Sequence, residues 1–396
     1  MKRIIIRKDC LDYITVLFMI LCSGTVVFNI RYNSIFIPIF CLYTLIRGVS
    51  IGKYKRNLPV LSTIIVAILF NGFVHVFDGV AWNGLTQVTL YLIGTAVACS
   101  TMSFERYKKT YIELLSYLTV LSIIIFWGVA NGLLGHSKVN VNGSFYQIAL
   151  FHIVGWGDTV FNTRMCGLFH EPGMFQVILN IGILYQADNI LKHEICKKDV
   201  VRLLLFAVGV LLTRSTTGYI VMCITLSSLY FKIKKYMKNK YLKVLYYGTV
   251  PACFFVGYKL LSSEVIVNKF SSNNISYNIR TNDFLSGILM LAKQPILGYG
   301  YNSKLYTKTS LKYGMDSMSN GIMGLLLMFG ILLTILFLYF MVRKIRNTKW
   351  TVNKLIVIAV IMIEEMTESW FFFPVSLAFI FSNYEEIKCK GEDGIV

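Results

Sequence analysis

The stretch Arg164-Met-Cys-Gly-Leu-Phe-His-Glu-Pro-Gly-Met-Phe-Gln176 lies between two long apolar blocks. It gathers an arginine, a histidine, a glutamate and a Gly/Pro turn at the entrance to an apolar run. Polar groups packed this densely beside a membrane helix cost stability and therefore indicate chemistry. Pro172 fits the first turn of a following helix, and Gly173 allows close backbone approach. The stretch predicts a shaped loop that leads into a membrane helix.

The composition indicates an integral membrane protein. Of 396 residues 56% are hydrophobic, and the mean hydropathy is +0.62, above the range of soluble domains. The net charge of +19 occurs as short clusters between apolar runs rather than as a continuous basic face, which argues against nucleic-acid binding. The nine cysteines show no CxxC spacing, so neither a zinc site nor a disulfide framework is expected.

The apolar blocks predict about twelve transmembrane helices in an all-α polytopic fold. The basic N-terminus before the first block resembles the start of a signal peptide, but no small-residue cleavage site follows, so an uncleaved first span is expected. The predicted spans are 10–30, 35–51, 58–77, 84–102, 111–133, 174–188, 200–213, 216–231, 244–261, 319–342, 354–368 and 370–384.

The distribution of positive charge predicts the orientation. With both termini in the cytoplasm, 28 of the 39 Lys and Arg residues fall in cytoplasmic segments, as the positive-inside rule requires. Two large exported loops, 134–173 and 262–318, then offer room for a site, and both are expected to contain short interfacial helices. The chain is treated as a single membrane domain, 1–396.

The second loop contains a predicted amphipathic helix over 278–293. The stretch Gln294-Pro-Ile-Leu-Gly-Tyr-Gly-Tyr-Asn302 ends that helix, and Gly298 and Gly300 permit backbone turns that would fold the loop back over the membrane. Both glycines are candidate substrate-binding positions.

Three exported arginines, Arg164, Arg214 and Arg280, lie beside apolar spans or turn motifs. An arginine fork binds a phosphate bidentately, so a cluster of forks near the membrane surface suits an anionic lipid headgroup. Each arginine taken alone could equally anchor a helix end. Their occurrence in three separate loops favours diphosphate recognition.

Glu171 and His170 precede the predicted helix. A carboxylate there complements the helix dipole, but beside an arginine in a low-dielectric pocket it could instead accept a proton from a sugar hydroxyl. The hydroxyls of Ser215 and Thr217 at a hairpin tip could cap a helix or admit a phosphate to backbone N–H groups. Asn320 could likewise cap a helix or hold an acceptor sugar.

Three glutamates, Glu364, Glu365 and Glu368, lie within the span predicted for 354–368. Carboxylates inside a membrane are expensive, so they are expected to pair with arginines or to line a polar cavity, and a transporter's proton relay is the alternative. The chain has no Asp-x-Asp pair, Walker loop or dinucleotide fingerprint. A sugar donor would therefore arrive already activated on a lipid.

In these features the chain resembles the O-antigen and capsule polysaccharide polymerases of Wzy type and the related O-antigen ligases. The resemblance covers most of the chain and depends on the order of four motifs. These are Arg164-x-x-Gly167-x-x-x-Glu171-Pro172, Ser215-Thr-Thr-Gly218, Arg280 followed by Pro295-Ile-Leu-Gly298-Tyr-Gly300, and Asn320 leading into a span with Gly324 and Gly330.

The resemblance implies a glycosyltransferase that needs no metal or other cofactor and faces outward from the bacterial plasma (inner) membrane. Its donor and acceptor would be oligosaccharides on undecaprenyl diphosphate, and a chain-length regulator would be a further partner. Arg164 and Arg280 would neutralise the diphosphate leaving group with help from Arg214, and Glu171 or His170 would orient or deprotonate the acceptor hydroxyl.

Ligases usually carry a histidine shortly before the asparagine of the last motif, where this chain has Asp316-Ser-Met-Ser319. This difference favours a polymerase over a ligase and makes Asp316 a further candidate base. A multi-pass transporter or flippase of lipid-linked sugars is the alternative from another class.

Overall fold

The computed structural model describes residues 8–141, 143–160, 164–192, 196–236, 275–315, 318 and 320–382. Within these residues the chain is mostly helical, with one antiparallel four-stranded sheet of order β1-β2-β3-β4. The elements are α1 (Lys8–Leu21), η1 (Val26–Arg31), α2 (Asn33–Ile51), α3 (Leu58–Val74), η2 (Val76–Asp78), α4 (Trp82–Thr101), α5 (Phe104–Ala130), β1 (Ser137–Val141), β2 (Ser144–Ala149), β3 (His152–Trp156), β4 (Thr159–Val160), α6 (Pro172–Lys192), α7 (Lys197–Thr213), α8 (Thr216–Tyr236), α11 (Ile275–Leu291), α12 (Lys304–Lys312), α13 (Gly321–Arg346), α14 (Lys354–Thr367) and α15 (Pro374–Phe381).

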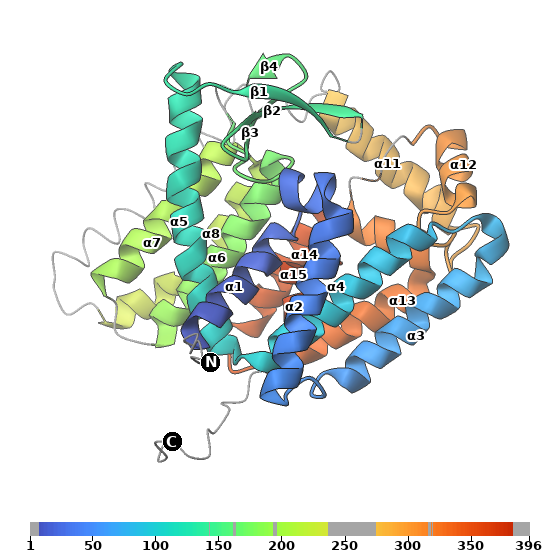
Figure 1. The fold of residues 1–396 in the computed structure, drawn as a ribbon, viewed down its shortest axis with the longest axis horizontal. Helices are drawn as coiled ribbons and strands as arrows, with labels where there is room; N and C mark the ends of the chain where they lie inside the picture. Colours follow the sequence, from blue (N-terminus) through green and yellow to red (C-terminus); the bar gives the residue numbers. More distant parts are fainter. Residues whose placement is uncertain are drawn as a thin grey trace, which may run out of the picture.

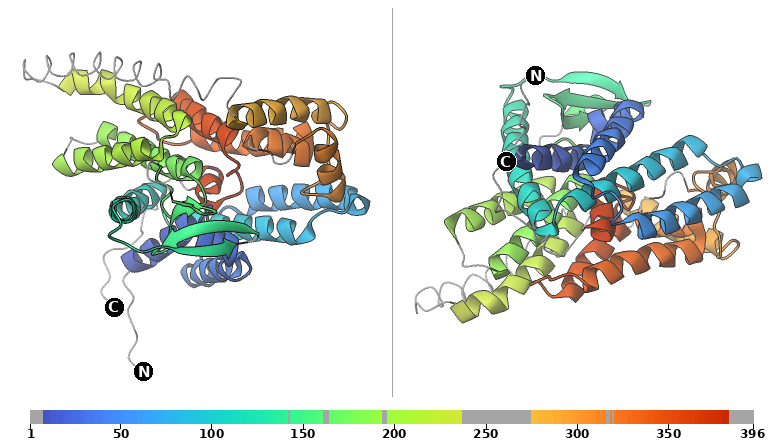
Figure 2. Two further views of the ribbon diagram at one scale, coloured as in Figure 1. Left: turned by 90° about the horizontal axis from the view of Figure 1, so that it is seen from above. Right: turned by 60° about the horizontal axis from the view of Figure 1, so that its bottom comes forward.

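The helices form a bundle, and the sheet lies across one end of it, called here the sheet end (Figure 1). Seen from above, α7 and α8 extend to one side, while α3, α11 and α13 extend to the other (Figure 2). Nearly every residue of α6 and all of α15 are buried, so these two helices form the centre of the bundle. Since both are buried around nearly their whole surface, each has neighbours on all sides.

Three of the described helices, α2, α5 and α13, are long and apolar enough to cross a membrane. Large apolar side chains on α2, α3 and α5, such as Ile46, Val66 and Ile124, are more than half exposed, as on a lipid-facing surface. These features are consistent with a membrane protein. Most predicted spans fall on helices, but a crossing by all twelve remains a prediction, and the span predicted for 244–261 lies outside the described residues.

The prediction of one continuous span over 10–30 is wrong. The helix ends at Leu21, Gly24 takes a positive φ of 85°, and a six-residue π-helix, η1, follows. At the break the Val26 N–H donates to the carbonyl of Leu168 at 3.2 Å, and Thr25 forms a β-bridge with Phe169. The break therefore has a partner segment, which the uninterrupted apolar sequence does not reveal.

The expectation of helices in the first exported loop is also wrong, because residues 137–160 form the sheet. Strands β2 and β3 pair Tyr146 with Trp156 and meet at a tight turn in which Leu150 and Phe151 both have positive φ. The two faces of the sheet pack on different parts of the bundle. Val141 and Ile153 pack with Val26 and Cys166, whereas Ala149 and Val154 pack on α5.

The helix predicted over 278–293 is confirmed as α11, with α12 following it. Between them, residues 295–300 insert into a kink of α13 at Gly330, where φ is 73° and ψ is 178°. The N–H groups of Tyr299 and Gly300 donate to the carbonyls of Leu327 and Met328 at 2.8 and 3.0 Å, and Ile331 N–H donates to Pro295 at 2.8 Å. The inserted segment thus satisfies the backbone groups that the kink releases.

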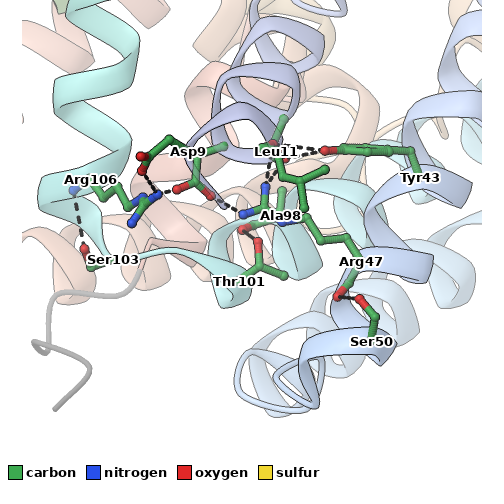
Figure 3. A network of polar contacts seen from close by, with 11 residues as sticks. Asp9, Leu11, Tyr43, Arg47, Ser50, Ala98, Thr101, Ser103 and Arg106 are labelled. Carbon is green, nitrogen blue, oxygen red and sulfur yellow. Dashed lines mark hydrogen bonds and ion pairs between the residues drawn. The ribbon is translucent and has the colours of Figure 1, made fainter. Parts of the chain in front are cut away.

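At the opposite end of the bundle, a buried ionic network joins α1, α2 and α5 (Figure 3). Arg47 binds the Asp12 carboxylate and donates to the Leu11 carbonyl at 2.8 Å, and Arg106 binds Asp12 and Asp9. A second cluster there pairs Lys108 with Asp188, whose carboxylate also accepts the N–H groups of residues 351 and 352. Such pairs are costly to break, because the remaining charge would be buried without a partner.

We expect Gly298→Ala to lower the thermal unfolding midpoint of the detergent-purified protein. A Cβ at Gly298 would lie 2.6 Å from the Leu327 carbonyl oxygen, and φ there is +68°. Gly314→Ala is the matched control, since its φ is +69° but a Cβ would meet nothing within 4 Å. In the control, only the unfavourable backbone conformation should lower the free energy of unfolding, by about 1 to 2 kcal/mol. Equal midpoints for the two variants would show that the insertion into α13 contributes nothing to stability.

Candidate active site

The Arg164 to Gln176 stretch reaches the sheet end as an extended segment that turns into α6. The Ile153 N–H of β3 donates to the Gly167 carbonyl at 2.7 Å, where φ is +59°. The rings of Phe169 and Phe175 stack with centroids 5.5 Å apart and fix the entry into the helix. Pro172 is the first residue of α6, as predicted. The segment is therefore held between the sheet and the break after α1.

The imidazole of His170 is held at both nitrogens. Its Nδ1 lies 3.0 Å from the carbonyl oxygen of Gly24, and its Nε2 lies 3.1 Å from Oε1 of Glu171. A carbonyl oxygen only accepts, so Nδ1 carries a proton and donates. The Nε2 contact with a carboxylate then also requires a proton. This geometry favours an imidazolium paired with a carboxylate.

The electrostatics agree with that assignment. Burial disfavours both charges, but the hydrogen bond and charge of Glu171 outweigh it and raise the pKa of His170. Conversely, the hydrogen bond and charge of His170 outweigh burial and lower the pKa of Glu171 to about 2. Each side chain remains about 30% exposed, with 29% for His170 and 32% for Glu171. A charged pair at the sheet end is thus accessible to a ligand.

Glu368 completes this group from the other side. It follows the last residue of α14, and its carboxyl lies so close to Gly173 that no side chain would fit there. Its carboxyl also interacts with that of Glu171, and burial together with the negative charge of Glu171 opposes the ionisation of Glu368. Arg280 of α11 lies 3.9 Å from Glu368 and is half exposed.

Below this pair, polar side chains continue into the bundle. Glu364 accepts hydrogen bonds from Gln176 at 2.7 Å and Asn180 at 3.0 Å, and Asn180 also donates to the Gly218 carbonyl at 3.2 Å. Glu365 accepts from Ser376 at 2.9 Å. The buried carboxylates thus have partners on α6 and α15 rather than the arginines that the sequence suggested, except at Glu368.

Arg164 and Arg214 meet at the corner between α7 and α8. The Arg164 Nε donates to the Thr213 carbonyl at 3.4 Å, and Arg214 occupies a left-handed conformation with φ of 52°. The neighbouring Met165 N–H donates to the Leu212 carbonyl at 2.9 Å. The segment of Arg164 is therefore bonded to the end of α7.

The other predicted residues have clear structural roles, and their proposed contacts with substrate remain predictions. The Ser215 hydroxyl accepts the Gly218 N–H at 3.3 Å, as a helix cap does, and Thr217 lies in the first turn of α8. Asn320 caps α13 by accepting the Met323 N–H at 2.9 Å, and the adjacent Gly321 packs on the backbone of Glu368. Gly298 and Gly300 hold the insertion into the α13 kink. Asp316 lies outside the described residues.

The sequence patterns do not identify two further groups of candidate site residues. Glu368 was grouped with Glu364 and Glu365 as an intramembrane acid, although it ends its helix and faces Glu171. Tyr146 and Trp156 lie in the sheet that was not predicted. The Trp156 indole N–H donates to the His170 carbonyl at 3.1 Å, and burial followed by the charge of Glu171 raises the pKa of Tyr146. The aromatic residues and alternation of 144–156 were the available signals for strands.

The mainly helical fold is consistent with a membrane protein, and the sheet end gathers a histidine, two glutamates and an arginine. Residues 201–364 match the model of a family described as O-antigen ligase, Wzy_C. No curated protein matches the chain. The match covers less than half of the chain and shows that this part is similar to that family. The matched residues 201–364 include Arg214, Arg280 and Asn320. The other predicted site residues Arg164, His170 and Glu171 precede them.

The His170–Glu171 pair predicts a specific dependence of stability on pH. His170 has a raised pKa, so its contribution is complete below about pH 6.5 and is lost as the pH rises through the raised value. Glu171 has a lowered pKa, so its contribution is lost only as the pH falls toward 2. The unfolding midpoint of wild type should therefore exceed that of His170→Gln most between about pH 5 and 6.5.

The difference should shrink at higher pH. Thermal unfolding in detergent across pH 5 to 9 measures it, with His136→Gln, at an exposed position in the segment between α5 and β1, as the control. A difference between wild type and His170→Gln that stays constant with pH would show that folding does not raise the pKa of His170.

Proposed function

We propose that the protein is a repeat-unit polymerase, a glycosyltransferase that joins oligosaccharides carried on undecaprenyl diphosphate at the outer face of the bacterial plasma membrane. The observation that carries this proposal is the meeting of Glu171, Glu368 and Arg280 beside His170, in a chain that matches the O-antigen ligase family over 201–364. The group combines an anionic acceptor of hydrogen bonds with a cation suited to phosphate.

On the donor side, Arg280 would bind the diphosphate. Its guanidinium is half exposed and lies 3.9 Å from the Glu368 carboxyl, so it borders the site and is open to an incoming anion. Arg164 and Arg214 at the α7–α8 corner would bind the other side of the same diphosphate. Positive charge aimed at the leaving group stabilises the transition state, where negative charge develops on the phosphate oxygen.

On the acceptor side, Glu171 would accept a hydrogen bond from the attacking sugar hydroxyl. The hydroxyl oxygen bonds to the anomeric carbon of the donor as the carbon–oxygen bond to phosphate breaks, and undecaprenyl diphosphate leaves with the bonding electrons. Since the pKa of Glu171 is about 2, it is a weak base and takes the proton only when the new bond has made the hydroxyl acidic. His170 holds Glu171 in its anionic state.

The proposed mechanism needs no metal or cofactor, because the arginines supply the charge that a divalent ion supplies in other glycosyltransferases. We also propose that the protein lies in the inner membrane with both termini in the cytoplasm. A chain-length regulator would be a further partner.

An O-antigen ligase is the second candidate, because the matching family bears that description. The same residues would act, and only the acceptor would differ. A flippase is less well supported, since Glu364 and Glu365 are held by amide and hydroxyl partners within the bundle.

We expect loss of polysaccharide chain length when the site is changed. In a deletion strain, wild type should restore a ladder of surface polysaccharide on a gel, whereas Arg280→Ala and Glu171→Ala should leave single exported repeats at equal protein levels. The expected loss of activity is about 100-fold or more for each. Arg31→Ala, an exposed arginine on η1, is the control. A full ladder from both site variants would refute the assignment, and repeats trapped in the cytoplasm after deletion would favour a flippase.

The choice between polymerase and ligase depends on the acceptor. Purified protein should extend one lipid-linked repeat with another and should not transfer repeats to a lipid A core oligosaccharide. Products separated by mass measure this directly. Transfer to the core without formation of linked repeats would make the protein a ligase and leave the donor side of the mechanism intact.

A further inference from the structure

Two aromatic residues of the sheet lie near the His170–Glu171 pair. Tyr146 and Trp156 are paired across β2 and β3, so their side chains project from the same face. Trp156 donates its indole N–H to the His170 carbonyl at 3.1 Å, and Tyr146 packs against the cluster that contains Cys166. The Trp156 ring is thus positioned by a contact with the candidate active site, and the Tyr146 ring lies beside it.

Trp156 has the exposure expected of a binding residue rather than of a core residue. Its polar atom is engaged at 3.1 Å, yet 41% of the residue is exposed. The adjacent Gly157 has open space around it, since a Cβ there would meet nothing within 4 Å among the residues that the structure describes. A large aromatic surface held rigidly beside charged groups suits a ligand with both apolar and polar faces.

We propose that Trp156, flanked by Tyr146, forms a sugar-binding subsite that holds the terminal sugar of the acceptor above Glu171. A pyranose presents C–H bonds on its flat face, and these carry slight positive charge that packs on the electron-rich face of an indole. Its hydroxyl groups project from the edge, where Glu171 and the Tyr146 hydroxyl accept or donate hydrogen bonds. The subsite would place the attacking hydroxyl next to Glu171.

This inference rests on the proposed function, because it assigns the acceptor to the same site. It also explains why the sheet lies across this end of the bundle: a rigid antiparallel sheet presents the rings with less motion than a loop would. Arg280 on α11 lies beside Glu368, so the donor phosphate would approach from the side of Glu368 and the acceptor sugar from the side of the sheet.

The test measures kinetics with purified protein and lipid-linked repeats while the acceptor concentration is varied. Trp156→Ala should raise the acceptor KM about tenfold with a smaller change in kcat, whereas Trp156→Phe, which keeps a ring but lacks the N–H, should stay within about threefold of wild type. Phe145→Ala is the matched control, since Phe145 precedes Tyr146 on β2 and projects from the opposite face.

Each outcome is decisive. An unchanged KM in Trp156→Ala overturns the subsite, and equal defects in the Ala and Phe variants would show that only the hydrogen bond to His170 matters, which also overturns it. Inactivity of wild type on lipid-linked repeats would instead refute the proposed function. Binding adds a readout that needs no turnover: the repeat oligosaccharide released from the host polysaccharide should change the tryptophan fluorescence of wild type but not of Trp156→Phe.

Discussion

A backbone N–H or carbonyl without a partner inside an apolar bundle costs several kcal/mol, and this constraint governs every irregular segment of the structure. The first apolar stretch breaks after Leu21, and its freed groups pair with the segment before α6. Helix α13 breaks at Gly330, and residues 295–300 enter the gap with matching donors and acceptors. A distant part of the chain forms backbone hydrogen bonds at each break. The breaks therefore also connect the helices to the rest of the bundle.

The candidate site is a consequence of the same constraint. The chain that pairs with the break after α1 continues through His170 and Glu171 into α6, and the Gly24 carbonyl that the break exposes accepts the hydrogen bond of His170. Glu368 is brought to the same place because α14 ends against the start of α13 and α6. The neighbouring imidazolium favours the anion at Glu171, and that negative charge opposes the ionisation of Glu368. The charges of the site therefore depend on where these helix ends meet.

The two ends of the bundle use charge in different ways. At the end opposite the sheet, Arg47 is paired with Asp12 and Lys108 with Asp188, and all four residues are buried, as is usual for a structural role. At the sheet end, His170, Glu171 and Arg280 are partly exposed while still held by neighbours. Side chains that are fixed but accessible are what recognition of a ligand demands, because little conformational entropy is then lost on binding. This contrast supports the assignment of function to the sheet end alone.

From sequence alone one could predict the mainly helical membrane fold, the position of α11, the start of α6 at Pro172 and the concentration of functional groups in 164–176. These follow from composition, from hydrophobic runs and from local propensities, which act over short distances along the chain. The break after Leu21, the four-stranded sheet, the pairing of Glu171 with Glu368 and the place of Trp156 were decided by tertiary structure. Each depends on a partner far away in the sequence: Gly24 and His170 are 146 residues apart, and Gln176 and Glu364 are 188 apart. The local sequence pattern indicates which groups need a hydrogen-bond or ionic partner. Only the folded structure determines which residue that partner is.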